Sequence, residues 1–337
     1  MNRGKINQFW IFTLFAVLLS NCKEAPQFYS NVLRSDVFVQ VYDQERFDFL
    51  WVFDNSGSMK PRRDFVRDNM QTFLDTLNSR KAIDFQMAVV TTDMFSHNGD
   101  LVQGAGGIEV VKSAESANPV ADFASIVNNV IDSPTSFWEQ GLESAYQGIL
   151  KHKAKFSREG VPLIIIFLTD EEDYSCSDDC FGVEPENNPN WTAWPTDRYI
   201  NYFANLKKSE ESNVHVFNIV GLENSPCDVA SSGGRYIEVL DGVTEKLDGL
   251  GVSGSICNSE LGDSYQNIAQ IISDRGVLFP LSSTAADTGI NVFVDQVHIP
   301  FSDDNYIFDQ ENNSIIFTGA IPKKGSLIEV TYSQLTE

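Results

Sequence analysis

Two short apolar runs, each leading to an acidic residue, constrain the fold of this 337-residue chain more than any other feature. Residues 49–53 run directly into Asp54, and residues 161–168 are followed two positions later by Asp170. Continuous apolar runs of this length are typical of central parallel strands that are covered on both faces. Because the carboxyl ends of such strands lie at one edge of the sheet, we expect both carboxylates to face one ligand-binding crevice.

Strands and helices alternate around these two runs. Further strands are expected at 85–92 and 214–220, and helices at 61–78, 138–152 and 265–272. This order predicts an α/β fold with a doubly wound, mostly parallel sheet and right-handed crossovers.

The pattern changes beyond Pro280, where no helical periodicity is found. Short strands are expected at 292–297, 306–308, 315–318 and 327–332, separated by turn signals such as Pro-Lys-Lys-Gly. A further strand is expected at 36–41, ahead of the α/β part. We therefore divide the chain into a signal segment (1–21), a tether with a leading strand (22–45), an α/β domain (46–280) and a small all-β module (281–337).

The first residues indicate export. Arg3 and Lys5 precede an apolar run at 9–19 that is too short to span a bilayer comfortably. The following Leu-Ser-Asn-Cys at 19–22 resembles the lipobox of bacterial lipoproteins, which implies that Cys22 is lipidated and that the peptide before it is removed. Asn21 departs from the usual Gly, Ala or Ser, so a plain secretory signal is the alternative. We expect a protein of the bacterial cell envelope, at the outer membrane or the cell surface, that contacts membrane only through its lipid.

The net charge excludes one class of partner. The chain has 47 acidic and 24 basic residues, a formal net charge of -23. Such a surface repels the phosphate backbone of nucleic acids. It suits a cation or a basic partner, although solubility in salty surroundings would also explain it.

The cysteines suggest disulfides. Four remain if Cys22 carries lipid, and an even number in an exported protein favours two bridges. Four cysteines can pair in three ways. We prefer the pairing in which one disulfide closes a short loop and the other closes a loop of medium length. Zinc is the alternative, but the spacings match no standard zinc site and the histidines are scattered. The preferred pairs are Cys176 with Cys180 and Cys227 with Cys257; the histidines are His97, His152, His215 and His298.

The motif with the clearest chemistry is Asp54-Asn55-Ser56-Gly57-Ser58, directly after a predicted buried strand and before a predicted helix. A turn leaving a strand can direct alternate side chains to one point, and Gly57 allows a tight backbone path. Carboxylate and hydroxyl oxygens suit Mg²⁺, Mn²⁺ or Ca²⁺. The alternative is that Asp54 caps a helix and the serines fill a turn.

Here the chain resembles the von Willebrand factor type A family over about residues 46–280. The resemblance implies a metal-ion-dependent adhesion site whose ligands are Asp54, Ser56 and Ser58. The family adds an Asp after its fourth strand, a role that Asp170 matches in Phe-Leu-Thr-Asp at 167–170. It also adds a Thr or Ser before a helix: Ser136 has the better spacing to Gly141, whereas Thr135 is the more usual residue type.

Two other segments contain acidic residues near predicted strand ends. The run at 171–173 with Asp178 and Asp179 could bind a second cation, but it lacks the spacing of a known calcium loop, so a solvated acidic loop is preferred. Thr92 and Asp93 follow another strand and could support the metal ligands, although an Asp there is ordinarily a turn residue.

The resemblance implies a binding protein that captures a protein or other ligand through a carboxylate, which completes the coordination of the metal. Cell adhesion follows only by family analogy. An envelope assembly or scaffolding protein is the alternative. A metal-dependent hydrolase is disfavoured because the motif segments contain no His, Cys or Lys to act as a base. We therefore expect no enzymatic activity.

Overall fold

The computed structural model describes most of the chain after the predicted tether. The described residues are 32–40, 46–79, 83–132, 138–176, 192–210, 213–224, 227, 230–247, 251–257, 259–274, 278–310 and 312–335. The predicted signal segment, Cys22, Thr135, Ser136, Asp178, Asp179 and Cys180 lie outside them. Within the described ranges, no helix is both long and apolar enough to cross a membrane.

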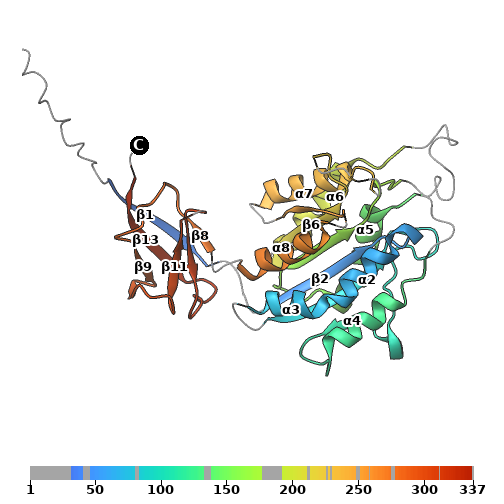
Figure 1. The fold of residues 1–337 in the computed structure, drawn as a ribbon, viewed down its shortest axis with the longest axis horizontal. Coiled ribbons are helices and arrows are strands. Elements are labelled where there is room, and N and C mark those ends of the chain that lie inside the picture. The colour runs from blue at the N-terminus through green and yellow to red at the C-terminus, as the bar shows by residue number, and fades with distance from the viewer. Residues whose placement is uncertain are drawn as a thin grey trace, which may run out of the picture.

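A six-stranded sheet forms the centre of the α/β domain, in the order β4-β3-β2-β5-β6-β7 (Figure 1). Only the pairing of β3 with β4 is antiparallel. The predicted fold class, a doubly wound and mostly parallel sheet, is therefore confirmed. The strands are β2 (Arg46–Phe53), β3 (Asp84–Thr91), β4 (Val110–Lys112), β5 (Leu163–Leu168), β6 (Val214–Val220) and β7 (Ser253–Ser255).

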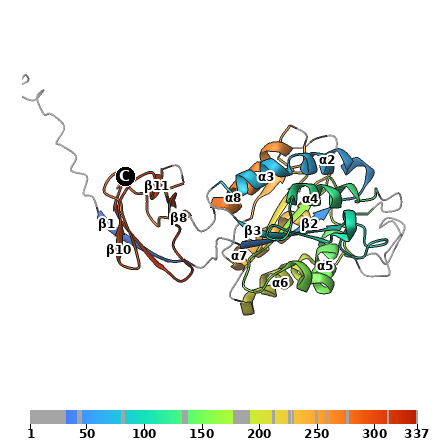
Figure 2. The ribbon, with the colours of Figure 1, turned by 90° about the horizontal axis from the view of Figure 1, so that it is seen from below.

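Helices cover both faces of this sheet (Figure 2). Alternate residues of β2 point to opposite faces of the sheet. Trp51 belongs to the buried apolar cluster on one face, and Leu50 and Val52 belong to the cluster on the other. The helices of the first layer are α2 (Lys60–Asp68), α3 (Met70–Leu77), α4 (Pro119–Asn128) and α8 (Leu261–Asp274). Those of the second are α5 (Gly141–Phe156), α6 (Thr196–Leu206) and α7 (Gly234–Leu247). Short 3₁₀ segments lie at Gly57–Met59, Ala105–Gly107 and Lys208–Glu210.

The helix predicted at 61–78 is in fact two helices. Asn69 separates α2 from α3 with non-helical backbone angles, and its side-chain Nδ2 donates to the carbonyl of Phe65 at 2.8 Å. An asparagine side chain competes with the helical hydrogen bonds of the backbone, which explains the break. Helices α4, α6 and α7 and strands β4 and β7 were not predicted.

The β module consists of two small antiparallel sheets, which confirms the expected all-β character of the C-terminal part. Their apolar faces form one core that includes Phe279, Ile315 and Val330. The four-stranded sheet has the order β1-β13-β9-β10, and the three-stranded sheet β11-β12-β8. The strands are β1 (Val32–Val39), β8 (Leu278–Pro280), β9 (Asn291–Val294), β10 (Val297–Ile299), β11 (Tyr306–Asp309), β12 (Ser314–Phe317) and β13 (Leu327–Gln334).

The strand predicted at 292–297 is a hairpin, because Asp295 and Gln296 both have positive φ, 49° and 68°. Two consecutive residues of this kind form the tight turn that joins β9 to β10.

The leading strand β1 belongs to this module. It pairs with β13 over its full length, from Val32 with Gln334 to Val39 with Leu327. Asp36 fixes it further: its carboxylate accepts hydrogen bonds from Tyr332 Oη at 2.9 Å and from Ser282 Oγ at 2.6 Å. The polypeptide therefore begins and ends its described part in one sheet, with the α/β domain between the two strands.

A disulfide joins Cys227 to Cys257, as predicted. This bond closes the loop after β6 onto the segment after β7 and excludes zinc binding by these two thiolates. Cys176 is also disulfide-bonded.

We predict that replacing both Cys227 and Cys257 with Ser lowers the free energy of unfolding by about 3 kcal/mol, because the closed loop restricts the unfolded chain. Urea unfolding followed by circular dichroism measures this. An unchanged midpoint in the double variant would show that the bond contributes nothing to stability.

Candidate functional site

Two adjacent parallel strands bring the predicted acidic ligands together. β2 and β5 pair up to Phe53 and Leu168, and the backbone N–H of Asp54 still donates to the carbonyl of Leu168 at 3.0 Å. Asp54 and Asp170 therefore leave the sheet side by side. Both side chains are buried, with 0% and 3% of the residue exposed.

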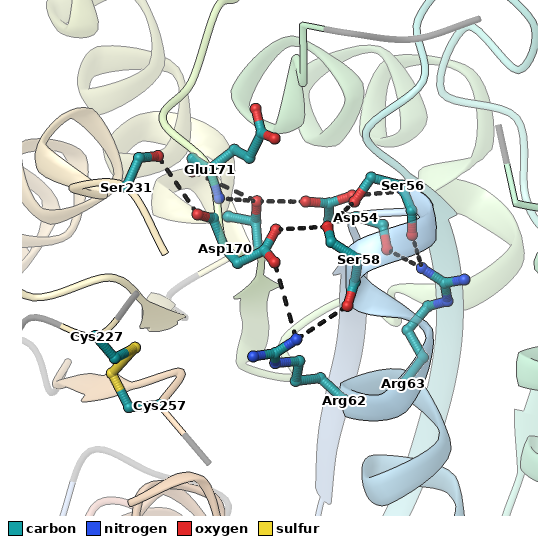
Figure 3. A network of polar contacts seen from close by, with 11 residues as sticks. Asp54, Ser56, Ser58, Arg62, Arg63, Asp170, Glu171, Cys227, Ser231 and Cys257 are labelled. Atoms are coloured by element: carbon teal, nitrogen blue, oxygen red, sulfur yellow. Dashed lines mark hydrogen bonds and ion pairs between the residues drawn. A yellow bond between two sulfur atoms is a disulfide. The ribbon is translucent and has the colours of Figure 1, made fainter. Parts of the chain in front are cut away.

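The turn after β2 directs its hydroxyls to the same point (Figure 3). The carboxylate of Asp54 accepts a hydrogen bond from the backbone N–H of Ser56 at 2.7 Å, which closes the turn. Ser56 Oγ and Ser58 Oγ are 3.0 Å apart, and Ser58 Oγ donates to Asp170 Oδ1 at 3.2 Å. The structure thus gathers four of the six predicted metal ligands in one cluster.

Gly57 is not required by this turn. A Cβ placed there would meet no atom within 4 Å, and its φ is not in the left-handed range. The expectation that glycine permits a tight backbone path is therefore wrong for this site.

Thr169 holds the other carboxylate oxygen of Asp54. Its Oγ1 donates to Asp54 Oδ2 at 2.7 Å and accepts the backbone N–H of Glu171 at 3.0 Å. One side chain therefore orients the Asp54 carboxylate and fixes the backbone after Asp170.

Two consecutive arginines support the turn from below. Arg63 donates to the carbonyls of Asp54 and Ser56 at 2.6 and 2.9 Å, and forms an ion pair with Asp132. Arg62 donates to the carbonyl of Ser58 at 2.9 Å and lies 4.0 Å from Asp170 Oδ2. Both arginines are at least 95% buried, with 5% and 3% of the residue exposed. They hold the turn's carbonyls away from the cluster while its hydroxyls face into it.

Sequence reasoning missed these arginines, although a signal was present. Arg62 and Arg63 occupy the first turn of α2, where the helix dipole disfavours positive charge. Such a local conflict indicates that tertiary contacts compensate, here the backbone carbonyls of the motif.

The site concentrates negative charge away from water. Burial, and then the charge of Asp54, raises the pKa of Asp170 to about 6. Burial, the charge of Asp54 and the charge of Asp170 together raise the pKa of Glu171 to about 7. Burial also raises the pKa of Asp54 itself. These carboxyls are thus held together at a free-energy cost that a nearby cation would reduce.

Glu139 is a second buried acid beside the cluster. Burial, followed by the charge of Asp54, raises its pKa to about 9, so that it carries a proton near neutral pH. Thr92 Oγ1 donates to Glu139, which commits the Thr92 hydroxyl to that contact. Asp93 accepts the backbone N–H of Ser96 at 2.8 Å, the ordinary role of a turn residue.

The acidic run after Asp170 is not a solvated loop. Asp173 is 1% exposed and accepts hydrogen bonds from the backbone N–H of Leu142, at the start of α5, and from Arg235. Glu172 accepts the backbone N–H groups of Asp173 and Arg235. These two acids support local structure, so the preference for a solvated loop is wrong for them.

The donor set fits a hard divalent cation. Two carboxylates and two hydroxyls converge, and such oxygen donors suit Mg²⁺, Mn²⁺ or Ca²⁺. Over the described ranges, no group of three or more His, Cys, Asp or Glu side chains could hold a metal ion. A cation at this cluster would therefore depend on Ser56 and Ser58 as much as on the carboxylates.

Comparison with protein families gives one match in this part of the chain. The model of the von Willebrand factor type A domain matches residues 48–188. Among curated proteins, a sequence search finds no match.

Several solved structures resemble the chain at low sequence identity. The pilus adhesin SpaC of Lactobacillus rhamnosus GG is 14% identical, with a TM-score of 0.46 over 90% of this chain and 42% of that one. The pilus adhesin RrgA of Streptococcus pneumoniae is 9% identical, with a TM-score of 0.36 over 90% and 58%. BatB of Bacteroides thetaiotaomicron is 14% identical, with a TM-score of 0.34 over 67% and 96%. The chain thus spans less than half the length of SpaC.

We predict that, in chelator, acidification from pH 7 to pH 5 stabilises the protein more than it stabilises Asp170→Asn. The pKa of Asp170 is about 6 in the fold, above its ordinary value, so the folded state binds this proton more tightly than the unfolded state. The contribution of Asp170 to stability is therefore greatest below the unfolded pKa and is lost as pH rises through about 6. Thermal unfolding at both pH values measures it, with the exposed Asp75→Asn as control; equal pH dependence in all three proteins would contradict the pKa assignment.

Proposed function

Because residues 48–188 match the von Willebrand factor type A domain, we propose that this domain binds a divalent cation and captures an acidic ligand through it. The observation that supports this most strongly is the convergence of Ser56, Ser58 and Asp170 on one point beside Asp54. A buried cluster with excess negative charge and hard oxygen donors favours a cation over any other small ligand.

We propose that the four predicted residues of this cluster are metal ligands. Asp54, Ser56, Ser58 and Asp170 supply oxygens directly or through water, and the bound cation, Mg²⁺ or else Mn²⁺ or Ca²⁺, acts as an electrophilic anchor for a ligand oxygen. The open space beside Gly57 lies on this turn and leaves room for an approaching group.

A fifth oxygen is assigned to Thr135 or Ser136. Two contacts support this assignment from the N-terminal side of that segment. Asn55 Nδ2, within the motif, donates to the carbonyl of Ile131 at 3.0 Å, and Asp132 forms the ion pair with Arg63. Asp132, three residues before Thr135, therefore lies next to the motif turn.

Ligand capture rather than catalysis is our assignment for the site. The described hydrogen-bond partners of the Ser56 and Ser58 hydroxyls are each other and Asp170. A serine nucleophile requires a base within hydrogen-bond reach, and no described histidine or lysine contacts either hydroxyl. Metal-dependent hydrolysis remains the alternative that a hydrolase screen with Mg²⁺ would reveal.

We place the protein outside the cytoplasm, anchored through lipid on Cys22. The disulfide between Cys227 and Cys257 supports an oxidising compartment. Two roles fit this location: adhesion at the cell surface, or the assembly of envelope components. Protease treatment of intact cells separates them, because only a surface-exposed protein is digested.

We predict that peptides captured from an array by the protein in Mg²⁺ contain an Asp or Glu that is essential for capture. Binding should disappear in chelator, in Asp54→Ala, and when the acidic residue of the peptide is replaced by its amide. The net charge of -23 repels acidic peptides in general, so local coordination must supply the attraction.

The exposed Asp75→Asn serves as control and should bind as the wild type does. Peptides that bind equally well in chelator and in Mg²⁺ would contradict the proposal and direct attention to the β module.

A further inference from the structure

The β module has a long open edge. β1 is the outer strand of the four-stranded sheet and has eight residues, whereas β10 at the other edge has three. Three apolar side chains on one face of β1 are accessible: Leu33 is 74% exposed, Val37 58% and Val39 54%. An exposed apolar edge strand of this kind is a template for pairing with another strand.

The main-chain groups at this edge are available for pairing. Gln40, just after β1, exchanges backbone hydrogen bonds with Ser326 and Gly325 on the β13 side. Because residues alternate in direction along an antiparallel ladder, the even-numbered residues of β1 bond to β13. Leu33, Ser35 and Val37 then direct their N–H and C=O groups outward. Among the described residues, β13 is the only strand that pairs with β1.

The sequence of β1 is complementary to itself. We propose that β1 pairs antiparallel with β1 of a second copy of this chain, centred on Ser35. This register places Leu33 opposite the partner's Val37 and Arg34 opposite the partner's Asp36, and each pair occurs twice. Opposite charges and apolar pairs that directly face one another stabilise antiparallel strands.

The neighbouring registers are less favourable. A shift by two residues in one direction sets Asp36 against the partner's Asp36, and in the other direction Arg34 against the partner's Arg34. Both place like charges directly opposite each other, which destabilises a strand pair. A shift by one residue is excluded because an outward-directed residue would then face one whose main chain is bonded to β13.

The two charged side chains are already ordered by contacts within their own module. Arg34 Nε donates to Gln334 at 2.7 Å on β13, and Asp36 is held by Ser282 and Tyr332. Both side chains are therefore ordered before a partner arrives, which reduces the entropy lost on association.

Pairing through β1 would present two metal sites on one particle. The candidate site lies at the carboxyl ends of β2 and β5, whereas β1 connects to the start of β2, so the site stays clear of the paired edge. Figures 1 and 2 show the β module beside the ends of α3 and α8. Two sites linked in this way bind a multivalent ligand with higher avidity than either alone.

Cysteine cross-linking of the full chain tests the register. Centring on Ser35 brings the two Ser35 Cα atoms to about 5.5 Å, within disulfide range. The two Val37 Cα atoms are then about 14 Å apart, beyond that range. Under mild oxidation Ser35→Cys should form a covalent dimer and Val37→Cys should not. The absence of a Ser35→Cys dimer, or equal cross-linking of both variants, would overturn the proposal.

Charge reversal provides a second test that does not depend on a thiol. Arg34→Asp sets two pairs of acids against each other and should weaken dimerisation in sedimentation equilibrium by about tenfold or more. Lys246→Asp makes the same charge change at an exposed position on α7, in the α/β domain, and should leave dimerisation unchanged. Dimerisation should persist in chelator, which separates this result from any failure of the cation site. A wild-type chain that stays monomeric at all concentrations would overturn the proposal.

Discussion

The burial of Asp54 beside Asp170 is the constraint on which the site depends. Two carboxylates at the ends of adjacent parallel strands are removed from water in a sheet that is covered on both faces. Such a pair is unfavourable unless hydrogen bonds and cations compensate. Thr169 and the backbone of Ser56 supply the hydrogen bonds, and Arg62 supplies part of the positive charge. A divalent cation would supply more charge at shorter range than a guanidinium 4.0 Å away.

The same architecture explains why the site is separated from the β module. Parallel strands place all their carboxyl ends at one edge, so the site gathers there, and the chain enters the domain at the opposite end of β2. The disulfide between Cys227 and Cys257 closes loops on the site's side of the sheet, and Ser231 in the same region donates its backbone N–H to the carbonyl of Asp170 at 2.8 Å. The candidate site and the module that we propose to dimerise therefore lie at opposite ends of β2.

The central strands and the convergence of the two carboxylates could be predicted from sequence, because the patterns that indicate them lie within short segments. The apolar runs before Asp54 and Asp170 gave the central strands, and strand adjacency then implied the crevice. What could not be predicted depends on contacts between distant residues. The pairing of β1 with β13 joins residues about three hundred positions apart, and the buried state of Asp173 depends on Arg235. The roles of Arg62 and Arg63 required the backbone path of the motif turn, which no periodicity encodes.

Direct titration with Mn²⁺, followed by electron paramagnetic resonance, tests the cation site without reference to any ligand. The full chain should bind about one equivalent of Mn²⁺ tightly, Mg²⁺ should displace it, and Asp75→Asn should behave in the same way. Asp54→Ala and the double variant Ser56→Ala with Ser58→Ala should lose this site while retaining the circular dichroism spectrum of the wild type. Equal Mn²⁺ binding by wild type and a folded Asp54→Ala would contradict the account.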